Sequence, residues 1–408
     1  MRRLRSSIAL VALLVSTAAG VGVVAGATPA GAATSGPGVG TPYVASLGDS
    51  YISGEAGRWA GNTNQSSSEI DALGPTAYDD NATGTAEQIP GCHRSKSAEI
   101  GIGGGVGSVN FACSGAKTST FTDSSGNFKP GIDFYNSGGN QGQALMLQNF
   151  AATHNVQMVM LSIGGNNFNF ASIVQTCVED FLLSPSWWPD YCSSDSSVTG
   201  NFSSANIAAQ VTAIRGAIDH IRSAMATDGY TPSMYTIVVQ DYPSPIPNGS
   251  GFRYSQSGYT RQSTGGCGFW NTDANWANAT ALPDIDNAVK SAVAGDAGTN
   301  IKVMDVSGAF NGHRLCENTV GLLEEKGLNS WTNAGAVNLT EWINQIRTVS
   351  TVFGPYQVQE SIHPNYWGQL ALRNCARQAF NNGAPKGGTC SISGTGLDAQ
   401  GEPNMLLH

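Results

Sequence analysis

The sequence has few basic residues for its length and one long apolar run. Lys and Arg number 20 against 29 Asp and Glu, and the formal net charge is −9. Three of the arginines, Arg2, Arg3 and Arg5, precede the apolar run, so removing that segment would change the charge from −9 to −12. Nucleic acids are bound by clustered Lys and Arg, so this charge balance argues against a nucleic-acid partner.

The apolar run extends from Ile8 to Val24 and is followed by small residues that end at Ala33. Basic residues before such a run and small residues after it are typical of a secretory signal peptide. Glycines interrupt the run, which argues against a membrane anchor, and no later stretch is long and apolar enough to cross a bilayer. We expect residues 1–33 to be a signal peptide and the remainder to be a secreted, soluble monomer without a stable membrane span.

The chain lacks Cys-x-x-Cys and clustered Cys/His spacings, which mark zinc sites, and we expect neither a metal nor a cofactor. All eight cysteines follow residue 33, and an even number in an exported chain predicts four disulfides. Sequence alone leaves many connectivities open. The cysteines fall into four couples, and nearest-neighbour pairing is the simplest assignment: Cys92 with Cys113, Cys177 with Cys192, Cys267 with Cys316 and Cys375 with Cys390.

Five short runs of apolar and β-branched residues have the nearly continuous pattern of strands that are covered on both faces. They are residues 43–47, 108–112, 156–163, 234–240 and 300–306. Segments with helical periodicity alternate with them, at 143–154, 206–226, 272–294 and 365–381. This alternation predicts a three-layer α/β/α sandwich around a five-stranded parallel sheet. Without a repeat or an evident linker, we expect one domain over 34–390 and a polar, Gly-rich, flexible tail over 391–408.

Ser50 follows the first predicted strand in the stretch Gly48–Gly54, at the edge of a parallel sheet where ligands bind. A serine nucleophile needs a base and donors for an oxyanion. Three later segments offer such groups: 110–116 and 162–167, which each follow a predicted strand, and 360–365, which precedes the last predicted helix. The Gly-x-Ser-x-Gly signature of α/β-hydrolases is absent, so that fold competes poorly.

Together these segments resemble the four sequence blocks of the SGNH subgroup of GDSL hydrolases, in the expected order and over nearly the whole chain after residue 33. The resemblance implies a flavodoxin-like SGNH-hydrolase fold. It also implies that Ser50 is the nucleophile, that His363 is the general base, and that the oxyanion hole consists of the Ser50 N–H, the Gly115 N–H and the Asn166 amide.

Two positions depart from that family pattern. Asn167 stands where the family often has Asp after the oxyanion Asn, and Glu360 stands where Asp is common three residues before the His. We slightly favour Glu360 as the carboxylate that orients His363, so that its imidazole accepts the serine proton. The alternative is a backbone carbonyl, which some secreted actinobacterial members use.

The chain is most similar to the disulfide-bearing secreted esterases and lipases of actinobacteria, which share the Cys-x-Arg-Ser segment at Cys92 and the His-x-x-Cys segment at His313. Three of the four expected disulfides match those proteins, and the Cys375–Cys390 pair is an addition. The implied function is hydrolysis of a lipid or other small acyl ester. Acetyl-polysaccharide esterase and acyltransferase activities stay open, and a non-catalytic wall- or carbohydrate-binding role is least favoured.

The segment from Cys177 to Cys192 is rich in aromatic and aliphatic side chains, Trp187 and Trp188 among them, and we expect it to line or overhang the site. Such a lining suits an acyl chain or, alternatively, sugar rings. A loop that is simply folded over its own aromatic residues is the third interpretation.

Overall fold

The structure, a computed structural model, describes residues 36–347 and 358–408. The predicted signal peptide lies outside the described residues. The described residues belong to one compact unit, Ser35–His408. No helix in the part of the chain that the structure describes combines the length and apolarity that a membrane crossing requires.

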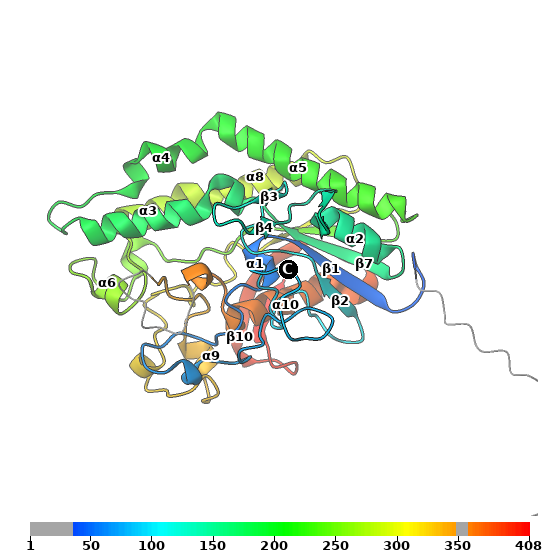
Figure 1. Cartoon of the computed structure of the whole chain (residues 1–408). Coiled ribbons are helices and arrows are strands. Elements are labelled where there is room, and N and C mark those ends of the chain that lie inside the picture. The colour runs from blue at the N-terminus through cyan, green and yellow to red at the C-terminus, as the bar shows by residue number, and fades with distance from the viewer. Residues whose placement is uncertain (1–35, 348–357) are drawn as a thin grey trace, which may run out of the picture. The chain divides into compact units, whose positions relative to one another are not determined.

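All five predicted strands are present and pair in parallel, and three of them, β1, β2 and β7, are labelled in Figure 1. They are β1 (Pro42–Gly48), β2 (Gly107–Asn110), β7 (Asn155–Ser162), β8 (Thr236–Gln240) and β9 (Ile301–Asp305). The strand order across these five is β2-β1-β7-β8-β9. After β1 the chain forms β2 on one side of β1, and it then forms β7, β8 and β9 on the other side. The boundary between β1 and β7 is therefore the topological switch point of a flavodoxin-like sheet.

Helices cover both faces of the sheet, as predicted for a three-layer sandwich. The longer ones are α2 (Gln143–Ala151), α3 (Phe170–Leu183), α5 (Ser204–Thr227), α8 (Leu282–Ala294) and α10 (Tyr366–Phe380). Shorter ones are α1 (Ser50–Ser53), α4 (Ser196–Thr199), α6 (Thr260–Ser263), α7 (Asn271–Trp276) and α9 (Ala336–Leu339). Two small ribbons, β3 (Phe121–Thr122) with β4 (Phe128–Lys129) and β5 (Asn136–Ser137) with β6 (Asn140–Gln141), lie outside the main sheet.

The central strand β7 shows why its sequence is continuously apolar. Met158 and Met160 point into a core cluster that also contains Leu370 of α10, whereas Val159 and Leu161 point into a second cluster with α2, α5 and α8. Successive side chains of a strand face opposite sides, so a strand covered by helices on both sides needs apolar residues at nearly every position.

The sheet is larger than predicted, and the expectation of a flexible tail over 391–408 is wrong. Seven strands are present, because β10 (Gly388–Leu397) joins β9 in parallel and β11 (Pro403–Leu407) pairs with β10 in antiparallel. Met405 and Leu407 are buried, and Glu402 forms an ion pair with Arg377 of α10. Pro403, Met405 and Leu407, which alternate along β11, and the Glu402 ion pair help to dock this hairpin, although its composition resembles a linker.

The four disulfides pair as nearest neighbours, which confirms the prediction. Two of them fix the surroundings of the strand ends: Cys92–Cys113 joins two loops near β2, and Cys177–Cys192 ties α3 to the loop that follows it. A third, Cys375–Cys390, links α10 to the start of β10 and so helps to dock the C-terminal hairpin.

Candidate active site

The candidate site lies at the carboxyl ends of β1 and β7, on either side of the switch point. Gly48 at the end of β1 lies opposite Ser162 at the end of β7, and the Asp49 N–H donates to the Ser162 carbonyl at 3.0 Å. Gly48 has φ +145°, and a Cβ there would lie 2.0 Å from the Ser162 carbonyl oxygen. Only glycine fits this close crossing of the two strands, and the crossing brings the segments after β1 and β7 together.

Ser50 occupies the first turn of α1, where the Asp49 carboxylate caps the helix by accepting the Tyr51 N–H at 3.2 Å. Its side chain faces a pocket that is lined by Asp49, Ser50, Tyr51, Gly165, Asn166, Phe170, Tyr242, Leu282 and Ile285. Ser50 itself is 6 % exposed. A serine at a helix start, shielded from bulk water but open to a pocket, is placed to react with a bound molecule.

His363 lies against Ser50, with its Nε2 2.7 Å from the serine Oγ. Its Nδ1 lies 2.9 Å from the carbonyl oxygen of Ser361. A carbonyl accepts only, so Nδ1 carries the proton and Nε2 is left to accept the Ser50 hydroxyl. Burial lowers the pKa of His363 below its usual value, which keeps the imidazole neutral at pH 7. The pair therefore has the hydrogen-bond polarity that activation of a serine requires.

Glu360 is not brought to His363, and this arrangement corrects the expectation that its carboxylate orients the imidazole. Its Oε1 accepts the Tyr78 hydroxyl at 2.6 Å and its Oε2 accepts the Trp59 indole N–H at 3.0 Å. The side chain is buried and anchors the segment that leads to His363. The acceptor at Nδ1 is the backbone carbonyl of Ser361, the alternative that the sequence left open.

We expect the Glu360→Gln variant to change any Ser50-dependent turnover by no more than about threefold, because the acceptor at His363 Nδ1 belongs to the backbone. Its melting temperature should fall, because a neutral amide replaces a buried carboxylate that accepts hydrogen bonds from Tyr78 and Trp59, and hydrogen bonds to a charged group are stronger than neutral ones. Steady-state kinetics and thermal unfolding of the purified variant measure both. A loss in kcat well above tenfold with unchanged stability would restore Glu360 as the orienting group.

The turn before His363 has a strained backbone. Ile362 adopts φ +60°, which is unusual for a β-branched residue. The Ile362 carbonyl accepts the Tyr51 hydroxyl at 3.0 Å, and the Ile362 N–H donates to the Asn344 carbonyl at 3.1 Å. Backbone strain of this kind persists where the surroundings fix it, often at functional sites. Here the turn points the Ser361 carbonyl back at His363.

Asn166 lies in the 3₁₀ turn Gly165–Phe168 after β7, lines the pocket at Ser50, and is hydrogen-bonded to the loop that contains Gly115. The Asn166 amide donates one hydrogen bond to the Ala116 carbonyl at 3.0 Å, and its second N–H is left for another acceptor. Asn167 also ties these two segments together, since its side chain donates to the Thr118 hydroxyl at 2.9 Å and accepts the Thr118 N–H at 3.2 Å. Gly115 has φ +80°, the left-handed conformation that favours glycine.

Tyr242, which follows β8 and is not among the residues expected at the site, connects the two halves of the site. Its hydroxyl accepts the Gly165 N–H at 3.0 Å and donates to the Asp49 carboxylate. Burial raises the pKa of Asp49 to about 7, and the Tyr242 hydrogen bond opposes that rise. The sequence signal that could have identified Tyr242 as a site residue is its position after a parallel strand, because residues there converge on one edge of the sheet.

An apolar pocket adjoins the one at Ser50 and shares three residues with it, Phe170, Leu282 and Ile285. Its other lining residues are mostly apolar: Ile173, Val174, Cys177, Phe202, Pro245, Ile246, Phe269, Asp273, Trp276, Ala277, Ala281 and Ile362. One wall is a face of α3, a helix that sequence analysis treated partly as a loop. The two pockets are therefore adjacent, and residues of α3 line both of them.

The expectation for the 177–192 segment is met only at its start. Among the described residues, Cys177 is the one member of this segment that lines the two pockets. Phe181 is buried against Trp270 instead, whereas Trp187 and Trp188 are exposed to solvent. The residues of α3 that line the pockets are mostly earlier in this helix: Phe170, Ile173 and Val174.

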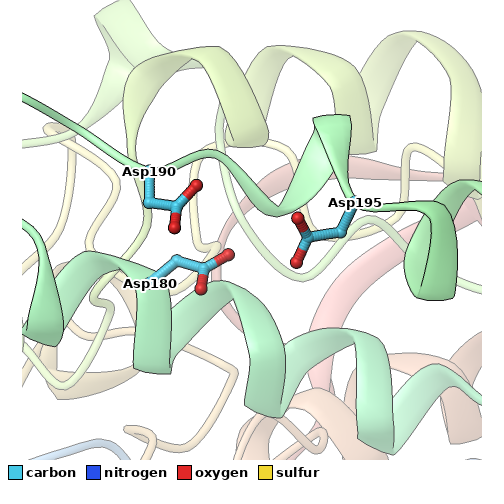
Figure 2. Close-up of side chains that lie close together, drawn as sticks. All are labelled: Asp180, Asp190 and Asp195. Carbon is cyan, nitrogen blue, oxygen red and sulfur yellow. The ribbon is translucent and has the colours of Figure 1, made fainter.

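Three carboxylates gather at the far end of α3, on Asp180, Asp190 and Asp195 (Figure 2). Burial, together with repulsion from Asp195 and Asp190, raises the pKa of Asp180 to about 6. The raised pKa means that the folded state favours the protonated form. Asp180 therefore lowers the free energy of unfolding little in acid, where it is protonated in both states. The destabilisation grows as the pH rises from the ordinary pKa of an aspartate through about 6.

We expect Asp180→Asn to raise the melting temperature by about 1–2 °C at pH 7.5, because it removes the cost of ionising a crowded carboxylate. Most of that gain should disappear at pH 4, where Asp180 is protonated in the folded protein. Differential scanning calorimetry at both pH values measures the change. The matched control is Asp219→Asn, at an exposed aspartate of α5.

Comparisons with known proteins give distant structural matches. No protein-family model matches the chain, and no curated protein does. An extracellular lipase from Streptomyces rimosus aligns with 83 % of this chain and 100 % of its own, at 23 % identity and a TM-score of 0.41. A phospholipase A1 from Streptomyces albidoflavus aligns with 85 % of this chain and 100 % of its own, at 18 % identity and a TM-score of 0.40. A lipase from a goat rumen metagenome aligns with 85 % of this chain and 99 % of its own, at 13 % identity and a TM-score of 0.35.

Proposed function

We propose that this protein is a metal-independent serine ester hydrolase in which Ser50 is the nucleophile and His363 the general base. The observation that carries the proposal is the 2.7 Å contact between the Ser50 Oγ and a His363 Nε2 whose ring is oriented through Nδ1. The apolar pocket that adjoins the one at this hydroxyl supports an ester with an apolar acyl group as the substrate.

In the proposed reaction the Ser50 Oγ attacks the ester carbonyl and its proton passes to His363 Nε2. The oxyanion that forms is held by the Ser50 N–H, the Gly115 N–H and the free N–H of the Asn166 amide. His363 then protonates the leaving alcohol, and an acyl group stays on Ser50. Water, activated by the same imidazole, releases the acid and restores the serine.

The charges around His363 suit a neutral base. Burial lowers its pKa, whereas the negative charge of Glu55 acts in the opposite direction. Glu55 is itself held 2.7 Å from the Nδ1 of His93, and the pair lies close to charge-neutral when His93 is protonated. Burial lowers the pKa of His93, but the hydrogen bond and charge of Glu55 outweigh it and raise the pKa overall. The pair therefore limits the field that Glu55 exerts on His363.

The adjoining pocket favours an acyl chain of several carbons over acetyl. Its lining is apolar apart from Asp273, and each methylene group that it buries contributes about 0.8 kcal/mol to binding. Acyl transfer to an alcohol would use the same acyl-enzyme and is a second candidate. The apolar lining gives less support to an acetyl-polysaccharide substrate.

A series of p-nitrophenyl esters tests this function and its chain-length preference. We expect octanoate and decanoate to be hydrolysed with a higher kcat/KM than acetate, and EDTA to leave the rates unchanged. Val174→Trp, which fills the pocket from α3, should lower kcat/KM for decanoate roughly tenfold, the equivalent of about two methylene groups, and spare acetate. Val174→Ala serves as the matched control. Equal loss on both esters would contradict the assignment of this pocket to the acyl chain.

A further inference from the structure

The last residue of α3 and the segment after this helix carry the most exposed large apolar side chains among the described residues. Leu183 is 84 % exposed, Trp187 82 % and Trp188 74 %, whereas the next, Tyr259, is 57 % exposed. Figure 1 shows this segment, between α3 and α4, as a loop at the left edge of the molecule. Exposed apolar residues that gather in one place mark an interaction surface more often than scattered ones do.

The loop is held in place rather than loosely attached, although its side chains face solvent. The Cys177–Cys192 disulfide closes it, the Trp188 N–H donates to the Pro185 carbonyl at 2.8 Å, and the Asp190 N–H donates to the Ser184 hydroxyl at 2.9 Å. Little conformational freedom is therefore left to lose when the indoles meet a partner, which favours binding.

The charges beside this loop indicate which kind of lipid surface it could bind. Asp180, Asp190 and Asp195 lie together beside the loop (Figure 2), and in the described part of the chain no Lys or Arg forms an ion pair with them. Such a surface repels an anionic membrane. A zwitterionic phosphocholine surface instead presents its quaternary ammonium outermost, a cation that both carboxylates and indole faces attract. Indoles also favour the lipid–water boundary.

The tip is continuous with the helix that lines the proposed acyl pocket. Ile173, Val174 and Cys177 on α3 line the apolar pocket, and the exposed residues follow at the end of the same helix. We propose that Leu183, Trp187 and Trp188 form a docking tip for zwitterionic lipid surfaces, which holds the pocket entrance against aggregated ester substrate. This inference rests on the proposed esterase function for its purpose, but the docking itself does not require catalysis.

Flotation with phosphatidylcholine vesicles tests the docking, with Ser50→Ala protein used so that the lipid is not hydrolysed. We expect the Ser50→Ala protein to float with the vesicles. Adding W187A/W188A to it should weaken binding by roughly tenfold or more, because binding strength follows the apolar area inserted. Tyr259→Ala, at an exposed aromatic residue elsewhere, is the matched control and should bind normally. Vesicles rich in phosphatidylglycerol should bind less.

A kinetic comparison separates docking from catalysis. With Ser50 intact, W187A/W188A should hydrolyse soluble p-nitrophenyl butyrate at the unchanged rate and vesicular phosphatidylcholine roughly tenfold more slowly. Absence of vesicle binding, equal binding by the double variant, or stronger binding to anionic vesicles would overturn the proposal. Trp-dependent binding to soluble acetylated xylan instead would replace the lipid with a polysaccharide. If Ser50 proves dispensable for ester hydrolysis while Trp-dependent flotation persists, the docking stands and the proposed function fails.

Discussion

Replacement of Ser50 by alanine is expected to lower kcat/KM for p-nitrophenyl octanoate by about 10⁴-fold or more. The variant keeps the oxyanion donors and the pocket but lacks the atom that forms the acyl-enzyme, and loss of a serine nucleophile has effects of this size. The fold should be intact, because the change removes one oxygen at the mouth of a pocket. Stopped or steady-state hydrolysis assays measure the loss, and circular dichroism with thermal unfolding checks the fold.

Ser53→Ala is the matched control for this experiment. Ser53 lies in the same short helix and is buried, but its hydroxyl hydrogen-bonds the Ser50 and His93 carbonyls rather than the His363 imidazole. We expect at most a few-fold change in this variant. Comparable losses in both variants would mean that the helix, rather than the Ser50 hydroxyl, determines activity.

Asn166→Ala is expected to lower kcat by about 10²–10³-fold with little change in KM, the effect of removing one oxyanion donor. The side-chain amide is held by its hydrogen bond to the Ala116 carbonyl, so its second N–H is oriented before substrate arrives. Donors that need no reorganisation act mainly on the transition state, which is why the loss should appear in kcat.

Asn167→Ala separates this direct role from loop support. Among the described residues, the hydrogen bonds of the Asn167 side chain go to Thr118 in the neighbouring loop. Its loss should cost no more than roughly tenfold, because the Asn166 amide keeps its own bond to Ala116. An Asn167 variant as impaired as the Asn166 variant would indicate that loop position, rather than a single donor, accounts for both effects.

The central sheet was predictable because burial on both faces imposes a continuous apolar pattern that turns and glycines interrupt. The disulfide pairs were predictable because close neighbours in the sequence also lie close in this fold. The C-terminal hairpin was missed because its strands are at an edge of the sheet, where the apolar residues of β11 that are buried are Pro403, Met405 and Leu407 and the composition stays polar.

The parts of the candidate site in which the chemistry requires a particular residue type could be predicted. The parts that depend on the direction in which a side chain or carbonyl points could not. Ser50 and His363 follow from the motif blocks, but whether Glu360 faces His363 depends on the backbone between them. The left-handed Ile362 turns the Ser361 carbonyl toward His363, while the Glu360 carboxylate binds Trp59 and Tyr78. Tyr242 was missed because its partners, Asp49 and Gly165, are far away in the sequence.

The most direct test of the account is covalent labelling with a p-nitrophenyl alkylphosphonate, followed by mass spectrometry of the intact protein and its peptides. A phosphonate reports an activated serine by forming a stable analogue of the oxyanion intermediate. We predict one adduct per chain on the peptide that contains Ser50, and none in Ser50→Ala or His363→Ala protein. Stoichiometric labelling of a different residue, or of Ser50→Ala protein, would contradict the assignment of Ser50 as the nucleophile.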